Sequence, residues 1–375
     1  MFIHFTVLLV ILLVSAFYEH SYRANKIRVI ADGGLASDYL GSILPWLIVF
    51  GYITFLAGMR TSVNDTSVYK DSFNQIDPSW DAVNEVISGN GKDKGFSIAA
   101  ILFKMYFSED YHMWFLFVAA VVSILLMNVI RRESVSFFDS CMTLFLTTLY
   151  YNYFTMMRQW IAVVIIFWAS RFIKKKKIIP YILFCILAAQ FHNSAYFMIL
   201  VYFVVIGKAW GKLQVALLSL FSISMLFLQP ILNMVGFFTE DTTYNYVVST
   251  MQTNSGSSLL RIPVAAAPLI IAFIYRKQIN PEEKMINLSI NMTMLSAMMI
   301  TLASFTSGLF VGRMSVYFQI YIVILVPYLF NVAINSKSRS LMRAVWHIGY
   351  FVYYMIQMTV SSAFYYGSDI IGVFE

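Results

Sequence analysis

The sequence predicts an all-α fold: a polytopic integral membrane helical bundle with about 12 membrane segments. Of the 375 residues, 59% are hydrophobic and only 12% are charged, whereas roughly a quarter of the residues of a soluble protein are charged. Apolar stretches of about 20 residues, the length that crosses a bilayer, recur along the chain. We therefore expect a single transmembrane domain over residues 1–375.

The basic residues predict the orientation of this bundle. The net charge of +7 does not indicate nucleic acid as a partner, because Lys and Arg form short clusters between apolar runs, as in loops that face the cytoplasm. The first run is followed by Arg23, Lys26 and Arg28, which favours a retained first helix with its N-terminus outside over a cleaved signal peptide. If every run crosses, the later basic clusters also face the cytoplasm. The apolar runs fall at about 1–18, 39–58, 112–130, 135–153, 157–173, 178–190, 195–206, 213–235, 259–275, 285–304, 314–334 and 344–364.

The segment 178–206 contains two apolar halves that flank His192, and each half is shorter than a membrane crossing. We expect two short, tilted or broken helices that meet near His192. Backbone that is not helical is tolerated at membrane depth only inside protein or beside a water-filled cavity. This pattern predicts that His192 lies in a cavity open to the outside, on the same side of the membrane as Arg158.

Two extracytoplasmic loops are expected, at about 59–111 and about 236–258. The first is rich in acids and contains a short apolar face at 95–107, which predicts a helix at the membrane interface. The second is rich in Thr, Ser, Asn and Tyr, a composition that suits either contact with a hydroxylated ligand or an ordinary solvated loop.

Several outward-facing arginines predict an anion site. Arg158, Arg261 and Arg313 open predicted helices that run from outside to inside, and Arg60 follows an outer helix end. Helix N-termini favour anions, and a guanidinium binds phosphate oxygens with two hydrogen bonds. Asn193 can cap a further helix beside His192. The pattern indicates a site for a strongly anionic head group.

Each of these residues can also be interpreted as a residue that takes no part in a functional site. An arginine at a helix end also extends to lipid head groups, a histidine also hydrogen-bonds broken helix ends, and Asp65 is also typical of a solvated loop. The chain has no phosphate-binding GxxxxGK[ST] loop, no HExxH zinc motif and no GxSxG serine motif. We therefore expect no metal and no nucleotide or other cofactor, and we interpret Cys141 and Cys185 as packing residues.

Five segments resemble the EpsG family of Wzy-like polysaccharide polymerases: RTSVNDTSVY (60–69), KGFSIAAILFK (94–104), YNYFTMMRQWIA (151–162), FHNSA (191–195) and VGRMSVY (311–317). The order of the RQxIA and FHxSA signatures makes the resemblance specific. One departure is that Lys94 occupies the position of the family's acid before Gly-Phe, with Asp93 one residue earlier.

The resemblance implies a GT-C-like polymerase architecture with an outward-facing cavity, in a multi-pass protein of the bacterial inner membrane. Such a polymerase joins oligosaccharide repeat units carried on undecaprenyl pyrophosphate. The implied partners are this lipid-linked oligosaccharide and membrane lipid. Whether a polysaccharide chain-length regulator is a further partner is left open. A lipid-linked sugar flippase or transporter and an O-antigen-ligase-like transferase are the alternatives.

The resemblance also implies roles for individual residues. The expected catalytic residues are His192, Arg158 and Arg313. Arg158 and Arg313, with Arg60 or Arg261, would hold the donor pyrophosphate, and His192 would be the general base or a ligand of the diphosphate. The expected substrate-binding residues are Arg60, Asp65, Asn152, Gln159, Asn193, Arg261 and Tyr317.

Overall fold

The computed structural model describes residues 2–32, 38–239, 249–251, 256–308, 310–360 and 364–374. They form two compact units, Met1–Leu200 with Ser340–Glu375, and Val201–Arg339, each of which is described by itself. Both units are helical almost throughout, which confirms the all-α character of the predicted fold. Residues 240–248 and 252–255 of the expected second outer loop lie outside the described residues.

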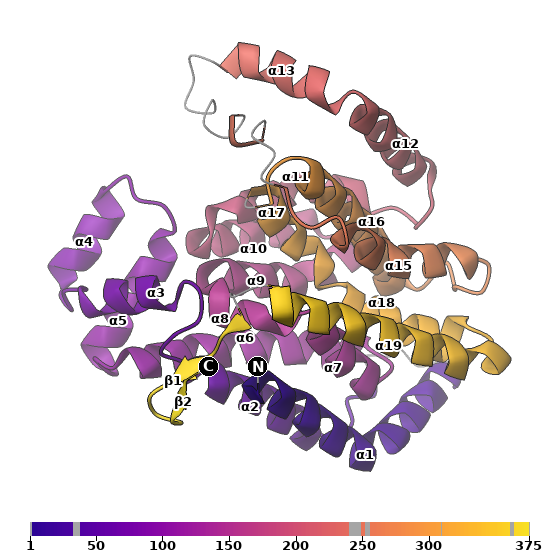
Figure 1. Ribbon diagram of the computed structural model, residues 1–375, viewed down its shortest axis with the longest axis horizontal. Coiled ribbons are helices and arrows are strands. Elements are labelled where there is room, and N and C mark those ends of the chain that lie inside the picture. Colours follow the sequence, from indigo (N-terminus) through magenta and orange to yellow (C-terminus); the bar gives the residue numbers. More distant parts are fainter. Residues whose placement is uncertain are drawn as a thin grey trace. The chain divides into compact units, whose positions relative to one another are not determined.

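The first unit begins with the long helix α1 and the shorter α2, which are followed by a group of three short helices, α3 to α5, and by α6 (Figure 1). Pro45 lies in the first turn of α2, where its missing N–H costs nothing. Ser79 and Asp110 cap α4 and α6 by accepting backbone hydrogen bonds. The bounds are α1 Phe2–Ala31, α2 Leu44–Gly58, α3 Thr66–Asn74, α4 Trp80–Ser88, α5 Lys94–Tyr106 and α6 Tyr111–Glu133.

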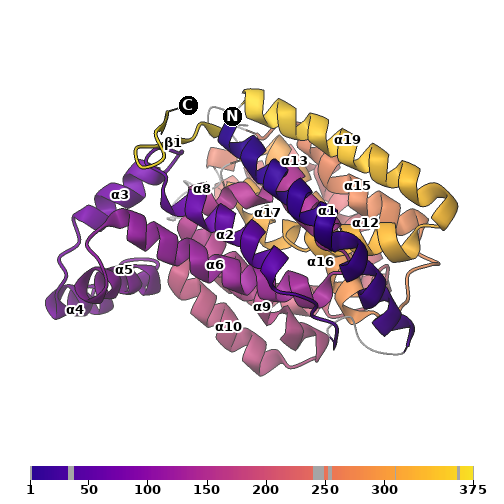
Figure 2. The same cartoon turned by 90° about the horizontal axis from the view of Figure 1, so that it is seen from below.

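The remainder of the first unit places α6 between α2 and α9, and α10 against the other side of α9 (Figure 2). Helix α1 packs against α2 and α7. The bounds are α7 Phe137–Leu146, η2 Leu149–Tyr151, α8 Asn152–Thr155, α9 Met157–Lys174, α10 Ile178–Phe191, η3 Asn193–Tyr196, β1 Gly367–Ser368 and β2 Val373–Phe374. The division between the units falls within α11 Phe197–Val205 and within α19 Ser336–Val360. The two strands pair antiparallel, with Gly367 opposite Phe374.

The second unit is built around α16, which packs against α12, α15, α17 and α18. Its bounds are α12 Lys212–Leu226, α13 Leu228–Thr239, α15 Arg261–Ile274, α16 Lys284–Phe305, α17 Phe310–Gln319, α18 Ile322–Tyr328 and the π-helix η4 Leu329–Ala333. The expected run 213–235 is divided into α12 and α13, which meet at 84°. The break follows from Pro230, whose ring would clash with the carbonyl of Leu226 in a continuous helix.

Three helices of the described chain are long and apolar enough to cross a membrane: Phe2–Ile30, Tyr111–Glu133 and Lys284–Phe305. The number rises to five if each bent helix pair is one crossing. The other apolar helices have 10–17 residues. The predicted count of about 12 segments and the GT-C-like architecture stay predictions.

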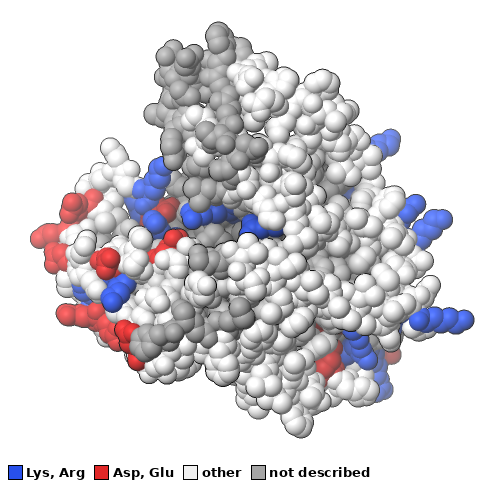
Figure 3. Space-filling view, viewed as in Figure 1, with Lys and Arg blue, Asp and Glu red and all other residues white. Residues whose placement is uncertain are grey.

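Two local predictions about the first unit are confirmed. The expected helix at 95–107 is α5, and the chain between the two apolar halves of 178–206 leaves the helical conformation at His192. His192 has an extended backbone, with φ of −157° and ψ of 115°, between the end of α10 and the start of η3. Acidic side chains gather over α3 to α5, at the left of Figure 3.

Candidate functional site

Asp93 is the centre of a polar cluster in the first unit. It precedes α5 in the left-handed backbone conformation, with φ of 58°, which Asp tolerates better than most residues. An aspartate at this position usually accepts a hydrogen bond from its own helix, but Asp93 makes no such bond. Its side chain is 8% exposed and is directed at another part of the chain.

The carboxylate of Asp93 connects Arg158, His192 and the backbone of Asn193. Its Oδ2 lies 3.2 Å from Nη1 of Arg158 and 3.5 Å from Nδ1 of His192. Its Oδ1 accepts a hydrogen bond of 2.9 Å from the backbone N–H of Asn193. We call these four residues the Asp93 cluster. It joins three positions that are far apart in the sequence.

These interactions determine the charge state of Asp93. Burial by itself would raise the pKa of this carboxyl. The polar contact with His192, the hydrogen bond from Asn193 and the positive charge of Arg158 outweigh burial and hold the pKa of Asp93 below its ordinary value. Asp93 is therefore a carboxylate at neutral pH, which neutralises a nearby cation and orients it.

Helix ends bring the cluster together. Arg158 is the second residue of α9. This helix begins after Met156, whose backbone is not helical and separates α9 from α8. Gly95 lets the start of α5 approach the end of α10, because a Cβ at Gly95 would lie 2.6 Å from Cβ and 3.0 Å from the carbonyl oxygen of Gln190. This close approach places Asp93 opposite His192.

The exposure of the cluster differs between its members. The side chain of Arg158 is 44% exposed and that of His192 is 31% exposed, so both reach the surface above the buried carboxylate. The guanidinium of Arg158 also lies 5.7 Å from the ring centre of Tyr69, within the range of a cation–π contact. Tyr69 in turn packs against Phe96 of α5. The arrangement places a partly exposed guanidinium and a partly exposed imidazole beside one buried carboxylate.

The sequence model of the EpsG family matches residues 43–368, which include every member of the Asp93 cluster. The chain belongs to the EpsG family. No curated protein and no solved structure matches it. Membership of the EpsG family is consistent with a polysaccharide polymerase, and the apolar helices fit a membrane protein.

The departure from the EpsG pattern before Gly-Phe has a structural explanation. Lys94 occupies the expected position of the acid, but its Nζ donates a 2.8 Å hydrogen bond to the carbonyl of Ile87, at the end of α4. Asp93, one residue earlier, supplies the carboxylate to the cluster. The sequence carried a signal for this residue, namely an acid two positions before Gly95 of the Gly-Phe pair. Tyr69 is the last residue of the RTSVNDTSVY segment. Neither residue was among the predicted site residues.

Arg60, another predicted substrate-binding residue, is enclosed in the same unit. Its side chain is fully buried, with its guanidinium 4.2 Å from the ring centre of Phe115. It donates hydrogen bonds to Thr66 and to the carbonyl of Ala57, and within the described chain its Nη2 has no partner. Burial lowers the pKa of Arg60 to about 10, so it remains charged at neutral pH. The predicted contact between Arg60 and substrate stays a prediction.

The other predicted residues lie outside the Asp93 cluster. Asn152 is buried and donates to the carbonyl of Leu149, and Gln159 is buried on α9. Asp65 precedes α3 and is partly exposed. In the second unit, Arg261 and Arg313 are exposed and Tyr317 is buried. Their roles stay predictions. Within the described part of the chain, no group of three or more His, Cys, Asp or Glu residues could hold a metal ion.

Proposed function

We propose that this EpsG protein is a polysaccharide polymerase that joins oligosaccharide repeat units carried on undecaprenyl pyrophosphate, at the extracytoplasmic face of the bacterial inner membrane. The observation that supports this function best is the Asp93 cluster, in which one buried carboxylate holds an arginine and a histidine beside each other. A glycosyl transfer from a diphosphate needs these two groups: a cation for the leaving group and a base for the acceptor.

Arg158 would bind the diphosphate of the donor. Its guanidinium is partly exposed and is oriented by Asp93 and Tyr69. When the bond between the anomeric carbon and the diphosphate oxygen breaks, the electron pair leaves with the diphosphate, whose negative charge increases. A guanidinium fixed in advance stabilises this charge more in the transition state than in the ground state.

His192 would act as the general base. Because its Nδ1 faces the Asp93 carboxylate, the proton of a neutral imidazole is favoured on Nδ1, and Nε2 keeps its lone pair. Nε2 would accept the proton of the acceptor hydroxyl while that oxygen forms a bond to the anomeric carbon. The 3.5 Å contact between Nδ1 and Asp93 would shorten to a hydrogen bond when the imidazole accepts the proton and becomes positively charged.

The proposal is tested in a deletion strain that carries wild type, Arg158→Ala or His192→Ala at matched protein abundance. The measurement is the distribution of sugar-chain lengths on a gel. Wild type should restore a ladder of long chains, and each variant should reduce polymer at least about 100-fold, the usual cost of losing one group that stabilises developing charge. A full ladder from either variant would contradict the role of that residue.

Arg28→Ala is the matched control, since Arg28 also has a single aspartate partner, Asp32 at 3.9 Å, but is 81% exposed at the end of α1. It should leave the ladder unchanged. The same strains test the two alternatives. If repeat units accumulate on the cytoplasmic side of the membrane in the deletion strain, the protein is a flippase. If the deletion strain makes chains of normal length but transfers them to no acceptor, the protein is a ligase-like transferase.

A further inference from the structure

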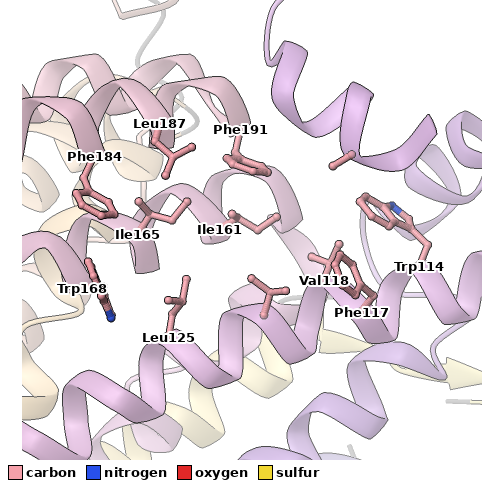
Figure 4. A pocket seen from close by; sticks show the side chains of 12 residues that line it. Trp114, Phe117, Val118, Leu125, Ile161, Ile165, Trp168, Phe184, Leu187 and Phe191 are labelled. Carbon is pink, nitrogen blue, oxygen red and sulfur yellow. The ribbon is translucent and has the colours of Figure 1, made fainter. Parts of the chain in front are cut away.

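An apolar cavity of about 390 Å³ lies in the first unit (Figure 4). Its volume is within the range of small-molecule sites. Trp114 and Trp168 contribute the polar side-chain groups of the lining, their indole N–H groups, and no polar atom contributes to the surface of the cavity. The lining residues are Ala99, Trp114, Phe117, Val118, Val121, Leu125, Ile161, Ile165, Trp168, Phe184, Leu187 and Phe191.

The cavity is a furrow along α9. Ile161, Ile165 and Trp168 of α9 form its floor, and residues of α6 and α10, which both pack against α9, form its walls. The seven residue steps from Ile161 to Trp168 correspond to about 10 Å along the helix axis. The furrow is therefore elongated and follows the direction of the membrane-embedded helices.

One end of the furrow adjoins the Asp93 cluster. Phe191 immediately precedes His192, and Ile161 lies one helical turn after Arg158 on α9. Ala99 lies on α5, the helix that Asp93 precedes. The charged groups and the apolar furrow thus occupy neighbouring positions on α5, α9 and α10, with the cation of Arg158 one helical turn before the first lining residue of α9.

The furrow also reaches the surface of the helices. Phe117 on one wall and Leu187 on the other are each 46% exposed. Both belong to apolar helices, and α6 is long enough to cross a membrane. A long hydrocarbon chain can therefore enter the furrow sideways from the bilayer, without passing through water.

We propose that this furrow binds the first isoprene units of a polyprenyl diphosphate whose diphosphate lies at the Asp93 cluster. The inference rests on the proposed function, and it adds the site for the tail of the lipid carrier. The chemistry of the lining favours this ligand over a phospholipid. In a polyprenyl diphosphate the hydrocarbon begins at the phosphate oxygen, whereas a phospholipid has two ester carbonyls there, which this apolar lining would leave without hydrogen-bond donors.

The experiment measures binding of undecaprenyl diphosphate, undecaprenol and phosphatidylglycerol to the purified full-length protein in nanodiscs. Val121→Trp fills the furrow from α6 and should weaken binding of both undecaprenyl lipids at least about tenfold. Arg158→Ala should weaken binding of undecaprenyl diphosphate but not of undecaprenol. Ile124→Trp is the matched control, because Ile124 is 60% exposed on the same helix and does not line the furrow.

The outcomes separate the tail site from the proposed function. If Val121→Trp leaves the binding of the undecaprenyl lipids unchanged, the proposed tail site is wrong. This holds even if the ladder still depends on Arg158 and His192. Equal affinity of wild type for phosphatidylglycerol would also overturn it. If Val121→Trp binds the undecaprenyl lipids more weakly than wild type, the tail site is supported. If Arg158→Ala and His192→Ala nevertheless give a full ladder, the proposed catalytic roles are wrong. Ala99→Leu fills the furrow from α5 and replaces Val121→Trp if that variant does not fold.

Discussion

Asp93 makes a testable contribution to stability through its charge. Its interactions with His192, Asn193 and Arg158 hold its pKa below the ordinary value in the folded protein, so the folded state favours the ionised form. This contribution is complete at a pH above the pKa of the unfolded chain, about 3.9, and is lost as the pH falls through the lower pKa of the folded state. Stability should therefore depend on Asp93 at neutral pH and less so in acid.

We expect Asp93→Asn to lower the free energy of unfolding by about 1–3 kcal/mol at neutral pH, because it removes charged hydrogen bonds of a buried group. The difference between wild type and variant should shrink as the pH falls from about 5 to about 3. Thermal unfolding of the detergent-purified proteins across this pH range measures it. A difference that is the same at every pH would contradict the argument.

Sequence reasoning found three members of the Asp93 cluster, Arg158, His192 and Asn193, and missed the carboxylate. Arg158 and His192 stand out because charged or titratable residues beside membrane-length apolar runs are costly. Asp93 lies among many acids in a polar segment, and its role depends on a left-handed backbone conformation and on the approach of α10, neither of which has a periodic signal. Arg60 illustrates the opposite case, since its charge was evident from the sequence but its burial against Phe115 was not.

At the scale of elements, the contact between α5 and α10 positions the cluster. Gly95→Ala would place a methyl group against the backbone of Gln190, so α5 must move away from α10 and take Asp93 with it. We expect this variant to shorten the ladder of sugar chains while the protein remains in the membrane, because Arg158 and His192 lose the carboxylate that orients them. Gel analysis of chain length at matched abundance measures the effect.

Gly91→Ala is the control for this contact. Gly91 lies four residues before Gly95, and a Cβ there would meet no atom within 4 Å. The control should keep a full ladder. If both glycine variants keep a full ladder, or both lose it, the contact between α5 and α10 does not position the cluster in the way we describe.

The sequence predicted elements where a single physical rule determines them. The break at His192 followed from the lengths of the two apolar halves, and α5 followed from its amphipathic pattern. The bend between α12 and α13 was missed, because hydropathy remains high through Leu228 and the effect of Pro230 on the carbonyl of Leu226 is steric. Composition indicates an apolar run but not its direction in space.

At the scale of the whole chain, composition and charge were sufficient to predict the class of protein. Apolar runs predicted a helical membrane protein, and the family match is consistent with that class. The number of crossings depends on which short helices combine into one crossing. A helix of 14 residues, such as α10, spans about 21 Å, less than the hydrocarbon core of about 30 Å, so counting apolar runs does not determine the number.

Another feature at this scale is the contact between the chain's C-terminal segment, 364–374, and the end of α2. The backbone of Gly367 pairs with that of Thr61 and Ser62, and the hydroxyl groups of Tyr366 and Ser368 donate to the carbonyls of Leu56 and Met59. Nothing in the sequence predicts this pairing, because the segment carries no recognised motif and its partners lie about 300 residues away. The C-terminal segment thus holds the turn that contains Arg60.

Tyr366→Ala should therefore destabilise the whole first unit, because it removes a fully buried aromatic side chain and the hydrogen bond to Leu56. We expect a loss of about 3–5 kcal/mol, the usual cost of truncating a buried aromatic residue. Tyr365→Ala is the matched control, since Tyr365 is 60% exposed and its loss should change stability by about 0.5 kcal/mol or less. The unfolding temperatures of the detergent-purified variants measure the difference. Equal temperatures for the two variants would mean that the C-terminal segment does not stabilise the end of α2, and that the enclosure of Arg60 depends on α2, α3 and α6 alone.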